Sequence, residues 1–301
     1  MRIASVLFAT ALLIAGGPVV AQPFPTKPIT LVVGFPPGGG VDIVARQLAD
    51  KLSQQLGQRV VVENKPGAAG NVATELVARA APDGYTLLMG NLGMLTVNPA
   101  LYPKLNFDAA RDLTPIARVV VTPLVAVVPS SLPVKNVADF VALARSKPGS
   151  LNFGSGGNGN INHLAPELLK LSTGTQIEHV PYKGSAPALA DLAGGRIQLM
   201  ITGEARSAAM PDVPTAKEAG LPDLVIYGWQ GVLAPAGTPA AVLERLSSEI
   251  AKALVDAELA GRLAGQGTQP AYQNATEFGT FIAGERKRWA EVVRAAKITL
   301  D

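Results

Sequence analysis

Two glycine-rich loops contain the groups of this 301-residue chain whose types and spacing suit chemistry. Each loop lies between an apolar run and an amphipathic stretch, so each is expected to join a strand to a helix. Such a turn leaves backbone N–H groups that the helix cannot use, and the positive end of the helix dipole favours an anion beside them. We therefore expect both loops to bind a small carboxylate. The candidate residues are Pro37, Gly38, Gly39, Gly40 and Asp42 in the loop 36–42, and Ser155, Gly156, Asn158 and Asn160 in the loop 154–160.

A purely structural explanation of these glycines stands beside the functional one. Either loop is explained equally well as a tight turn that needs glycine only for its backbone geometry. Asp42 is typical of a residue that caps a helix, and it is also placed to orient a ligand amine or an ordered water. The occurrence of two such loops in two separate parts of the chain favours a shared binding site.

Neither loop contains Arg or Lys, and the nearest basic candidates are Lys65 and Lys183 in other loops. An anion would therefore be recognised mainly by backbone amides, hydroxyl groups and water. Each helix end contributes about 0.3–1 kcal/mol, or up to ~2 kcal/mol where it is partly buried. Micromolar binding requires about 8 kcal/mol, so closure around the ligand has to add hydrogen bonds and exclude solvent.

The loop 154–160 supports a second hypothesis, a dinucleotide-dependent enzyme. Gly154, Gly156 and Gly159 match the G-x-G-x-x-G pattern of a dinucleotide-binding turn, and Glu178 follows where an acidic ribose ligand would lie, at the end of the next strand. The pattern also occurs widely outside such enzymes, and an exported chain has no access to soluble nicotinamide cofactors. Carboxylate binding without a cofactor is therefore the favoured interpretation.

Other catalytic or metal-binding patterns are weaker. The chain has no cysteine, which excludes a thiol nucleophile, a thiolate metal site and a disulfide framework. His163 and His179 have no second ligand at metal-binding spacing, so a core or rim role is expected for both. Ser155 does not lie in a G-x-S-x-G elbow, because residue 153 is Phe. We expect a binding protein that carries out no catalysis.

The elements that position the two loops follow from the alternation of apolar runs, glycine-rich turns and amphipathic stretches. This alternation predicts an α/β protein with a doubly wound parallel sheet. Because parallel strands bring their carboxyl ends to one edge, the loops that follow them are expected to converge there. The expected strands are 29–35, 60–63 and 86–89, and the loops that follow them are 36–42, 65–71 and 90–96.

A long β-branched run marks the passage to a second unit. Residues 116–128 form this run, which is broken at Thr122-Pro123, and further strand and helix patterns follow. A strand with Trp229 begins near residue 224 and is expected to return to the first unit. The predicted organisation is a first lobe of residues 22–104 and 224–301, a second lobe of residues 105–223, and a ligand cleft between them.

The amino terminus is typical of a secretory signal peptide over residues 1–21. Arg2 is followed by an apolar run at 4–15 and by small residues ahead of Gln22. This run is shorter than the ~20 residues that span a bilayer, although an uncleaved anchor is the alternative. Loss of Arg2 lowers the formal charge of +3 by one, which is too small to predict binding to nucleic acid or to an anionic membrane.

Many short motifs, spread in order over nearly all of the mature chain, resemble those of the substrate-binding proteins of tripartite tricarboxylate transporters, the Bug-type receptors. They are P-T-K-P-I at 25–29, F-P-P-G-G at 35–39 with Asp42, V-E-N-K-P-G-A-A-G at 62–70, P-D-G-Y-T-L at 82–87, N-P-A-L-Y at 98–102, G-S at 154–155 with H-L at 163–164, V-P-Y-K-G at 180–184, P-D-V-P-T at 211–215 and A-P-A-G-T-P at 234–239.

The resemblance implies a two-lobed α/β fold like that of type II periplasmic binding proteins, which closes on a small organic acid in the periplasm. It implies that loop backbone and bridging waters from both lobes hold one carboxylate of the ligand. Carried over by motif, the additional contacts are the loop at Asn91 in the first lobe and the turn at Tyr182 and Lys183 in the second. The implied partners are two integral membrane subunits, and we expect a monomer that binds no cofactor and no nucleic acid.

One departure from the family pattern follows Ile201. The family normally has a loop, a helix and a returning strand before the proline-rich turn, whereas residues 202–207 lead into that turn almost at once here. About twenty residues are missing, the size of one helix plus one strand. A strand of the second lobe, or the return crossing, would then be lost. This predicts, as a further alternative, a degenerate receptor with impaired closure or folding.

Overall fold

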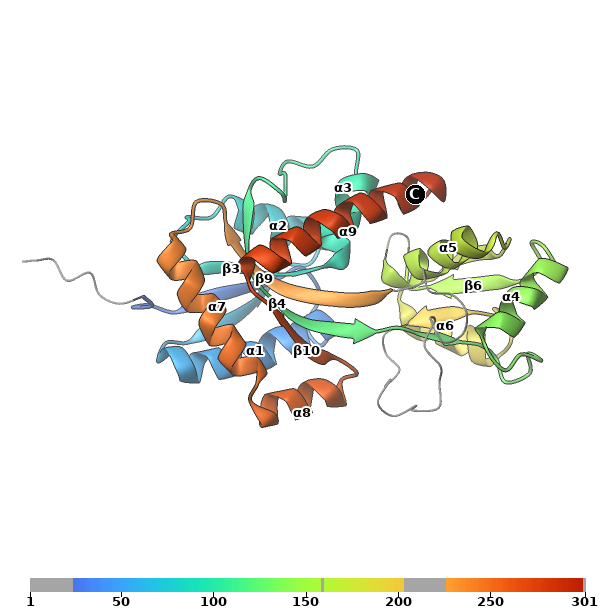
Figure 1. Ribbon diagram of the computed structural model, residues 1–301, viewed down its shortest axis with the longest axis horizontal. Coiled ribbons are helices and arrows are strands. Elements are labelled where there is room, and N and C mark those ends of the chain that lie inside the picture. The colour runs from blue at the N-terminus through green and yellow to red at the C-terminus, as the bar shows by residue number, and fades with distance from the viewer. Residues whose placement is uncertain (1–23, 158–159, 203–225, 300–301) are drawn as a thin grey trace, which may run out of the picture.

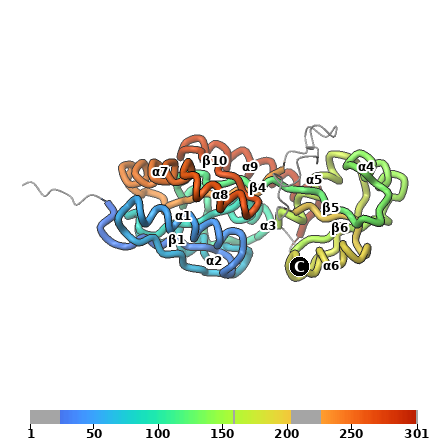
Figure 2. The backbone as a smooth tube through the Cα atoms, turned by 90° about the horizontal axis from the view of Figure 1, so that it is seen from below, coloured from blue at the N-terminus to red at the C-terminus, as the bar shows by residue number. Residues whose placement is uncertain are grey.

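The computed structural model describes residues 24–157, 160–202 and 226–299, which form two α/β lobes lying side by side and joined by two long strands (Figure 1). A view turned by 90° shows the same two bodies end to end (Figure 2). The predicted signal peptide, Asn158 and the segment that follows Thr202 lie outside the described residues.

The first lobe is built on a six-stranded sheet in the order β10-β4-β9-β3-β1-β2. β1, β2 and β3 are parallel, with Val33 opposite both Asn64 and Met89, so their carboxyl ends lie at one edge. The loops predicted to converge therefore leave the sheet at the same edge. The strands are β1 (Ile29–Val33), β2 (Val60–Asn64), β3 (Thr86–Asn91), β4 (Leu113–Pro123), β9 (Tyr227–Pro235) and β10 (Gln269–Gln273).

Helices cover both faces of this sheet, because alternate residues of its central strands are apolar on both sides. In β1, Ile29, Leu31 and Val33 pack into one buried cluster and Val32 into the other. The helices of the first cluster are α1 (Gly40–Leu56), α7 (Ala240–Leu254) and α8 (Ala257–Gly265). Those of the second are α2 (Asn71–Ala78), α3 (Asn98–Leu101) and α9 (Ala275–Ala295), together with a π-helix, Gly93–Val97, and a 3₁₀ turn, Ala68–Gly70, precedes α2.

The second lobe has two small sheets of two short strands each. β6 and β7 are parallel, β5 and β8 are antiparallel, and an isolated bridge links Phe153 of β6 to Leu199, the residue before β8. Its strands are β5 (Val125–Val127), β6 (Asn152–Ser155), β7 (Glu178–Pro181) and β8 (Met200–Thr202), and its helices are α4 (Val137–Ser146), α5 (Ile161–Thr173) and α6 (Ser185–Ala193). α5 also packs against α9 of the first lobe, with Leu164 in the same buried cluster as Trp289.

The chain crosses between the lobes on β4 and β9. The sequence places residue 105 in the second lobe, but β4 belongs to the six-stranded sheet and the chain enters the second lobe only after Pro123. β9 returns beside it, with Tyr227 opposite Pro123. The return crossing is therefore present. Of the two expected losses, that of the return crossing is wrong, and that of a strand of the second lobe stays a prediction.

Candidate functional site

The first loop is held by the carboxylate of Asp42, which lies in the first turn of α1 and is 2% exposed. One oxygen accepts the N–H of Gly38 at 2.8 Å and Nε of Arg46 at 2.9 Å, and the other accepts Nδ2 of Asn64 at 2.8 Å. Asn64 also donates to the carbonyl of Phe35 at 3.0 Å. A single buried carboxylate thus connects the loop, the helix and the end of β2.

These contacts decide the ionisation and the role of Asp42. Burial acts to raise its pKa, but the hydrogen bonds from Arg46, Gly38 and Asn64 outweigh burial and hold the pKa below its ordinary value. Asp42 is therefore a carboxylate at neutral pH whose two oxygens are occupied within the lobe. The sequence allows Asp42 either to cap the helix or to contact a ligand. The geometry shows that it holds the loop in shape, and its contact with a ligand stays a prediction.

The exposed part of the first loop is its backbone. Gly39 precedes α1 in an extended conformation, and the helix begins at Gly40 with no side-chain cap. The N–H groups of the first turn have no acceptor within a helix, so those of Gly40 and Val41 are available to a ligand. Pro37, Gly38, Gly39 and Gly40 are all exposed.

A second loop at the same edge, Gly67–Gly70, carries backbone strain that sequence reasoning does not anticipate. Ala68 and Ala69 have φ values of 46° and 53°, between two glycines that also have positive φ. The left-handed region costs a residue with a Cβ about 1–2 kcal/mol, and such strain clusters at functional sites. Asn98 fixes this turn, since its Nδ2 donates to the carbonyl of Ala69 at 3.0 Å.

The third loop of this edge begins at Asn91, the last residue of β3. Its side-chain oxygen accepts the N–H of Met94 at 3.0 Å and so starts the π-helix. Arg286 of α9 closes that helix, donating from Nε and Nη2 to the carbonyl of Leu95 at 3.3 and 3.2 Å. Burial lowers the pKa of Arg286 below its ordinary value.

In the second lobe, Ser155 ends β6 and is fully buried. Its Oγ lies 2.7 Å from Nε2 of His179, 3.1 Å from the carbonyl of Gly157 and 3.2 Å from the N–H of Gly157. The ring of His179 stacks on that of His163, with centroids 3.8 Å apart and an interplanar angle of 10°. Their stacking is not found by sequence motifs, because the two histidines lie on different elements, β7 and α5.

The remaining predicted residues of the second lobe lie around this serine. The side-chain oxygen of Asn160 accepts the N–H of His163 at 3.0 Å and caps α5. Tyr182 donates its hydroxyl to Asp191 at 2.8 Å; burial, together with the Asp191 carboxylate, raises the pKa of Tyr182. Lys183 is exposed. Asn158 lies outside the described residues.

Close approach of two turns makes the second loop compact. A Cβ added to Gly156 would lie 3.2 Å from the backbone nitrogen of Ser185 and 3.3 Å from the carbonyl carbon of Gly184. The turn at 182–184 therefore lies against the loop 154–157. Ser185 begins α6 and Ile161 begins α5, so the amino ends of both helices meet at one edge of the β6–β7 pair.

The dinucleotide hypothesis fails on the position of Glu178. A ribose-binding acid has to lie at the carboxyl end of the strand after the glycine-rich turn. Glu178 instead begins β7 and lies opposite Asn152, whereas Pro181 is the residue opposite Ser155. The carboxylate is therefore at the far end of the strand pair from the loop. Counting residues along the sequence misplaces it by one strand length.

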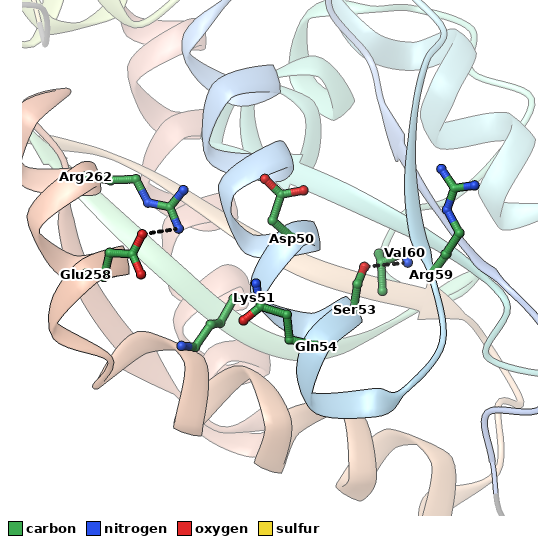
Figure 3. Close-up of a pocket in the computed structure, with 8 residues that line it drawn as sticks. All are labelled: Asp50, Lys51, Ser53, Gln54, Arg59, Val60, Glu258 and Arg262. Carbon is green, nitrogen blue, oxygen red and sulfur yellow. Dashed lines mark hydrogen bonds and ion pairs between the residues drawn. The ribbon is translucent and has the colours of Figure 1, made fainter.

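A shallow polar cavity of about 420 Å³ lies elsewhere, on the outer surface of the first lobe between α1, the start of β2 and α8 (Figure 3). Its charges are largely paired within the protein. Arg262 lies 3.6 Å from Glu258, and Lys51 lies 2.5 Å from Asp256. The cavity is lined by Asp50, Lys51, Ser53, Gln54, Arg59, Val60, Glu258 and Arg262, none of which is a predicted site residue.

Neither a metal centre nor a membrane span emerges within the part of the chain that the structure describes. Across residues 24–157, 160–202 and 226–299, no three acidic, histidine or cysteine side chains are grouped so that they could hold a metal ion. Over the same ranges, no helix is both long enough and apolar enough to cross a membrane.

Comparison with known proteins shows the family to which this chain belongs. The profile of the TctC family, described as the tripartite tricarboxylate transporter family receptor, matches residues 44–203 and 195–298. The chain belongs to this receptor family. Its relatives include BugT of Bordetella pertussis, which is 36% identical over 98% of this chain and 96% of BugT.

Solved structures of family members share the fold. Rpa4515 of R. palustris, determined with adipate, is 35% identical to this chain, with a TM-score of 0.79. The match covers 92% of this chain and 99% of Rpa4515. MatC (Rpa3494) of Rhodopseudomonas palustris, determined with bound malate, is 32% identical with a TM-score of 0.73 and covers 90% of this chain and 100% of its own. The two-lobed receptor fold expected from the sequence is thereby confirmed.

The same comparison measures the shortening of this chain. The alignment with BugT has 315 positions, yet 98% of 301 residues is about 295, so about 20 positions have no residue of this chain. The two matched segments of the family profile overlap at residues 195–203. The number of unmatched positions is close to the shortening expected after Ile201, and the place of that shortening stays a prediction.

Proposed function

We propose that this receptor binds a small organic carboxylate between its two lobes in the periplasm and delivers it, as a monomer and without catalysis, to the membrane subunits of a tripartite transporter. The proposal is supported by the family, by the adipate and malate held by its solved relatives and by the geometry of the loops. Two sheet edges, one per lobe, end in glycine-rich loops followed by helix amino ends.

One observation carries the proposal. Five of the predicted side chains make hydrogen bonds inside their own lobe, which leaves the loop backbones and the exposed Lys183 as the groups presented to a ligand. These five side chains are Asp42, Asn91, Ser155, Asn160 and Tyr182. Backbone N–H groups at helix starts favour an anion, and a carboxylate accepts several of them at once.

The direct test measures binding. Calorimetry of the mature chain, residues 22–301, against malate, adipate and other mono- and dicarboxylates should give saturable binding of at least one acid. A neutral diol or amide of the same length should not bind. Absence of binding to every acid would refute the proposal. Solution scattering that does not change on saturation with a bound acid would instead indicate a receptor that fails to close.

A single substitution tests the role of the backbone. Gly40 is the first helical residue, where proline is favoured, and Gly39 has φ −76° and ψ 163°, as a residue before proline prefers. Gly40→Pro removes one N–H, and a Cβ at Gly40 meets nothing within 4 Å. We expect the affinity for a carboxylate to weaken about tenfold or more, because one hydrogen bond to a charged acceptor is lost. Gly40→Ala keeps the N–H and is the matched control.

A further inference from the structure

A column of three stacked aromatic rings lies next to the second loop and contacts it through Ser155. Phe153 of β6 lies 4.8 Å from His179 of β7, and His179 lies 3.8 Å from His163 of α5, with ring planes within 19° and 10° of parallel. The column thus joins three elements that meet under the loop 154–157. Its outer member, His163, is 5% exposed.

The buried hydroxyl of Ser155 transmits this support to the loop. Its single proton can go either to the carbonyl of Gly157 or to Nε2 of His179. When Ser155 donates to Gly157, Nε2 of His179 must carry the proton that Ser155 accepts. The N–H of Gly157 also points to the same oxygen, at 3.2 Å. Ser155 therefore contacts both the N–H and the carbonyl of Gly157, whose φ is +129°.

We propose that His163 and His179 are positioning residues, which fix Ser155 and through it the backbone of the loop 154–157, where a ligand carboxylate would bind. The link to ligand affinity rests on the proposed function, but the fixing of the loop does not. His163 acts by stacking and His179 by stacking and by its Nε2 hydrogen bond. Neither histidine need touch the ligand.

Two charged residues of α5, Glu167 and Lys170, lie near the three stacked rings. Glu167 lies 3.9 Å from Nε2 of His163 and is engaged by Lys170 at 2.8 Å. Lys170 in turn lies 5.6 Å from the ring of Phe153. Glu167 and Lys170 lie on α5, farther along the helix from the loop, whereas the hydrogen bond between His179 and Ser155 reaches the loop itself.

Hydrogen exchange of the loop tests the proposal without any ligand. In mass spectrometry of the full mature chain, a peptide spanning 154–160 should exchange about tenfold faster in Ser155→Ala and His179→Ala, the loss of about one hydrogen bond. His179→Gln supplies an amide near the position of Nε2 and should regain part of the protection. His163→Phe keeps a flat ring and should be slower than His163→Ala. Ser172→Ala, on the exposed part of α5, is the control.

Two results would overturn the proposal. One is exchange in His179→Ala equal to that of the unaltered chain. The other is His179→Gln exchanging as fast as His179→Ala, which would leave His179 only as packing. Affinity for adipate or malate, measured on the same variants, should weaken in the same order as exchange quickens. If the unaltered chain binds no acid, the proposed function fails while the exchange results still decide the positioning role.

Discussion

Asn64 and Asp42 are joined by a 2.8 Å hydrogen bond from Nδ2 to Oδ1, which ties the end of β2 to the first turn of α1. The carboxylate of Asp42 is buried. Arg46 connects to the same pair, because its Nη2 donates to Oδ1 of Asn64 at 2.9 Å. Asp42, Arg46 and Asn64 therefore form a closed triangle below the first loop. Loss of any one member should loosen the same segment.

Substitution of Asp42 should destabilise the protein by about 2 kcal/mol. Asp42→Asn removes the charge that Arg46 and Gly38 bind, and hydrogen bonds to charged groups contribute about 1.5–3 kcal/mol. Urea unfolding measures the change. Asp50→Asn, an exposed carboxylate on the same helix, should alter the free energy of unfolding by less than about 0.5 kcal/mol. Equal effects of the two substitutions would show that the triangle contributes nothing.

The stability of the protein should depend on the protonation of His163. Burial, then repulsion from His179 and Lys170, lowers the pKa of His163 from 6.5 to about 3. Below pH 6.5 the imidazole of His163 therefore binds a proton in the unfolded chain, whereas in the folded chain it binds one only near pH 3. The free energy of unfolding should be unaffected above pH 6.5 and should fall on acidification by up to ~1.4 kcal/mol per pH unit.

His163→Phe isolates this contribution, because phenylalanine cannot take up the proton. Urea unfolding at pH 7, 6 and 5 should show a shallower dependence on pH in the variant, while the other titrating groups contribute alike to both proteins. Parallel pH profiles would mean that His163 titrates normally in the folded protein.

The turn at Gly70 should tolerate no larger residue. Gly70 has φ +91°, and a Cβ there would lie 2.7 Å from Cγ of Met94. Gly57 also has positive φ, +66°, but a Cβ at that position meets nothing within 4 Å. Gly57→Ala should therefore cost only the left-handed strain, about 1–2 kcal/mol, and Gly70→Ala clearly more. Thermal unfolding compares the two, and Met94→Ala should partly rescue Gly70→Ala.

The contact between α5 and α9 should contribute to the stability of the whole molecule. Leu164 is fully buried in the cluster that contains Trp289. Leu164→Ala should lower the free energy of unfolding by about 2–5 kcal/mol. Leu171 lies on the same helix but is 44% exposed, so Leu171→Ala is the control, with an expected change below about 0.5 kcal/mol. An unaltered midpoint for Leu164→Ala in urea would mean that the lobes do not depend on this contact.

Sequence reasoning predicts the strands and helices that position the first loop because their signals are local. An apolar run, a glycine-rich turn and an amphipathic stretch suffice to place β1 and α1. The same reasoning misses β10, since Gln269–Gln273 contains Pro270 and has no clear alternation, and its strand character comes from pairing with β4. The π-helix at Gly93–Val97 likewise depends on a distant partner, Arg286.

For the candidate site, the sequence identifies the loops but not how each side chain is used. Ser155 appears as a ligand donor until the fold buries it against His179, a residue from the next strand. The stacking of His163 on His179 has no sequence signature, because it depends on how α5 packs over β7. Glu178 is misassigned for a related reason, since the start of a short strand cannot be fixed by residue type alone.

The pairing of Tyr227 with Pro123 gives the molecule a modular construction. Everything between these two residues is inserted at the open end of one antiparallel ladder, where paired backbones lie about 5 Å apart. A two-residue turn could replace the insertion and leave all six strands of the large sheet in register. Gains and losses of length inside the insertion can therefore leave the strand register of the frame that carries Asp42 unchanged, as long as the contact between α5 and α9 is kept. One half of the proposed binding surface can then diverge while the other is preserved.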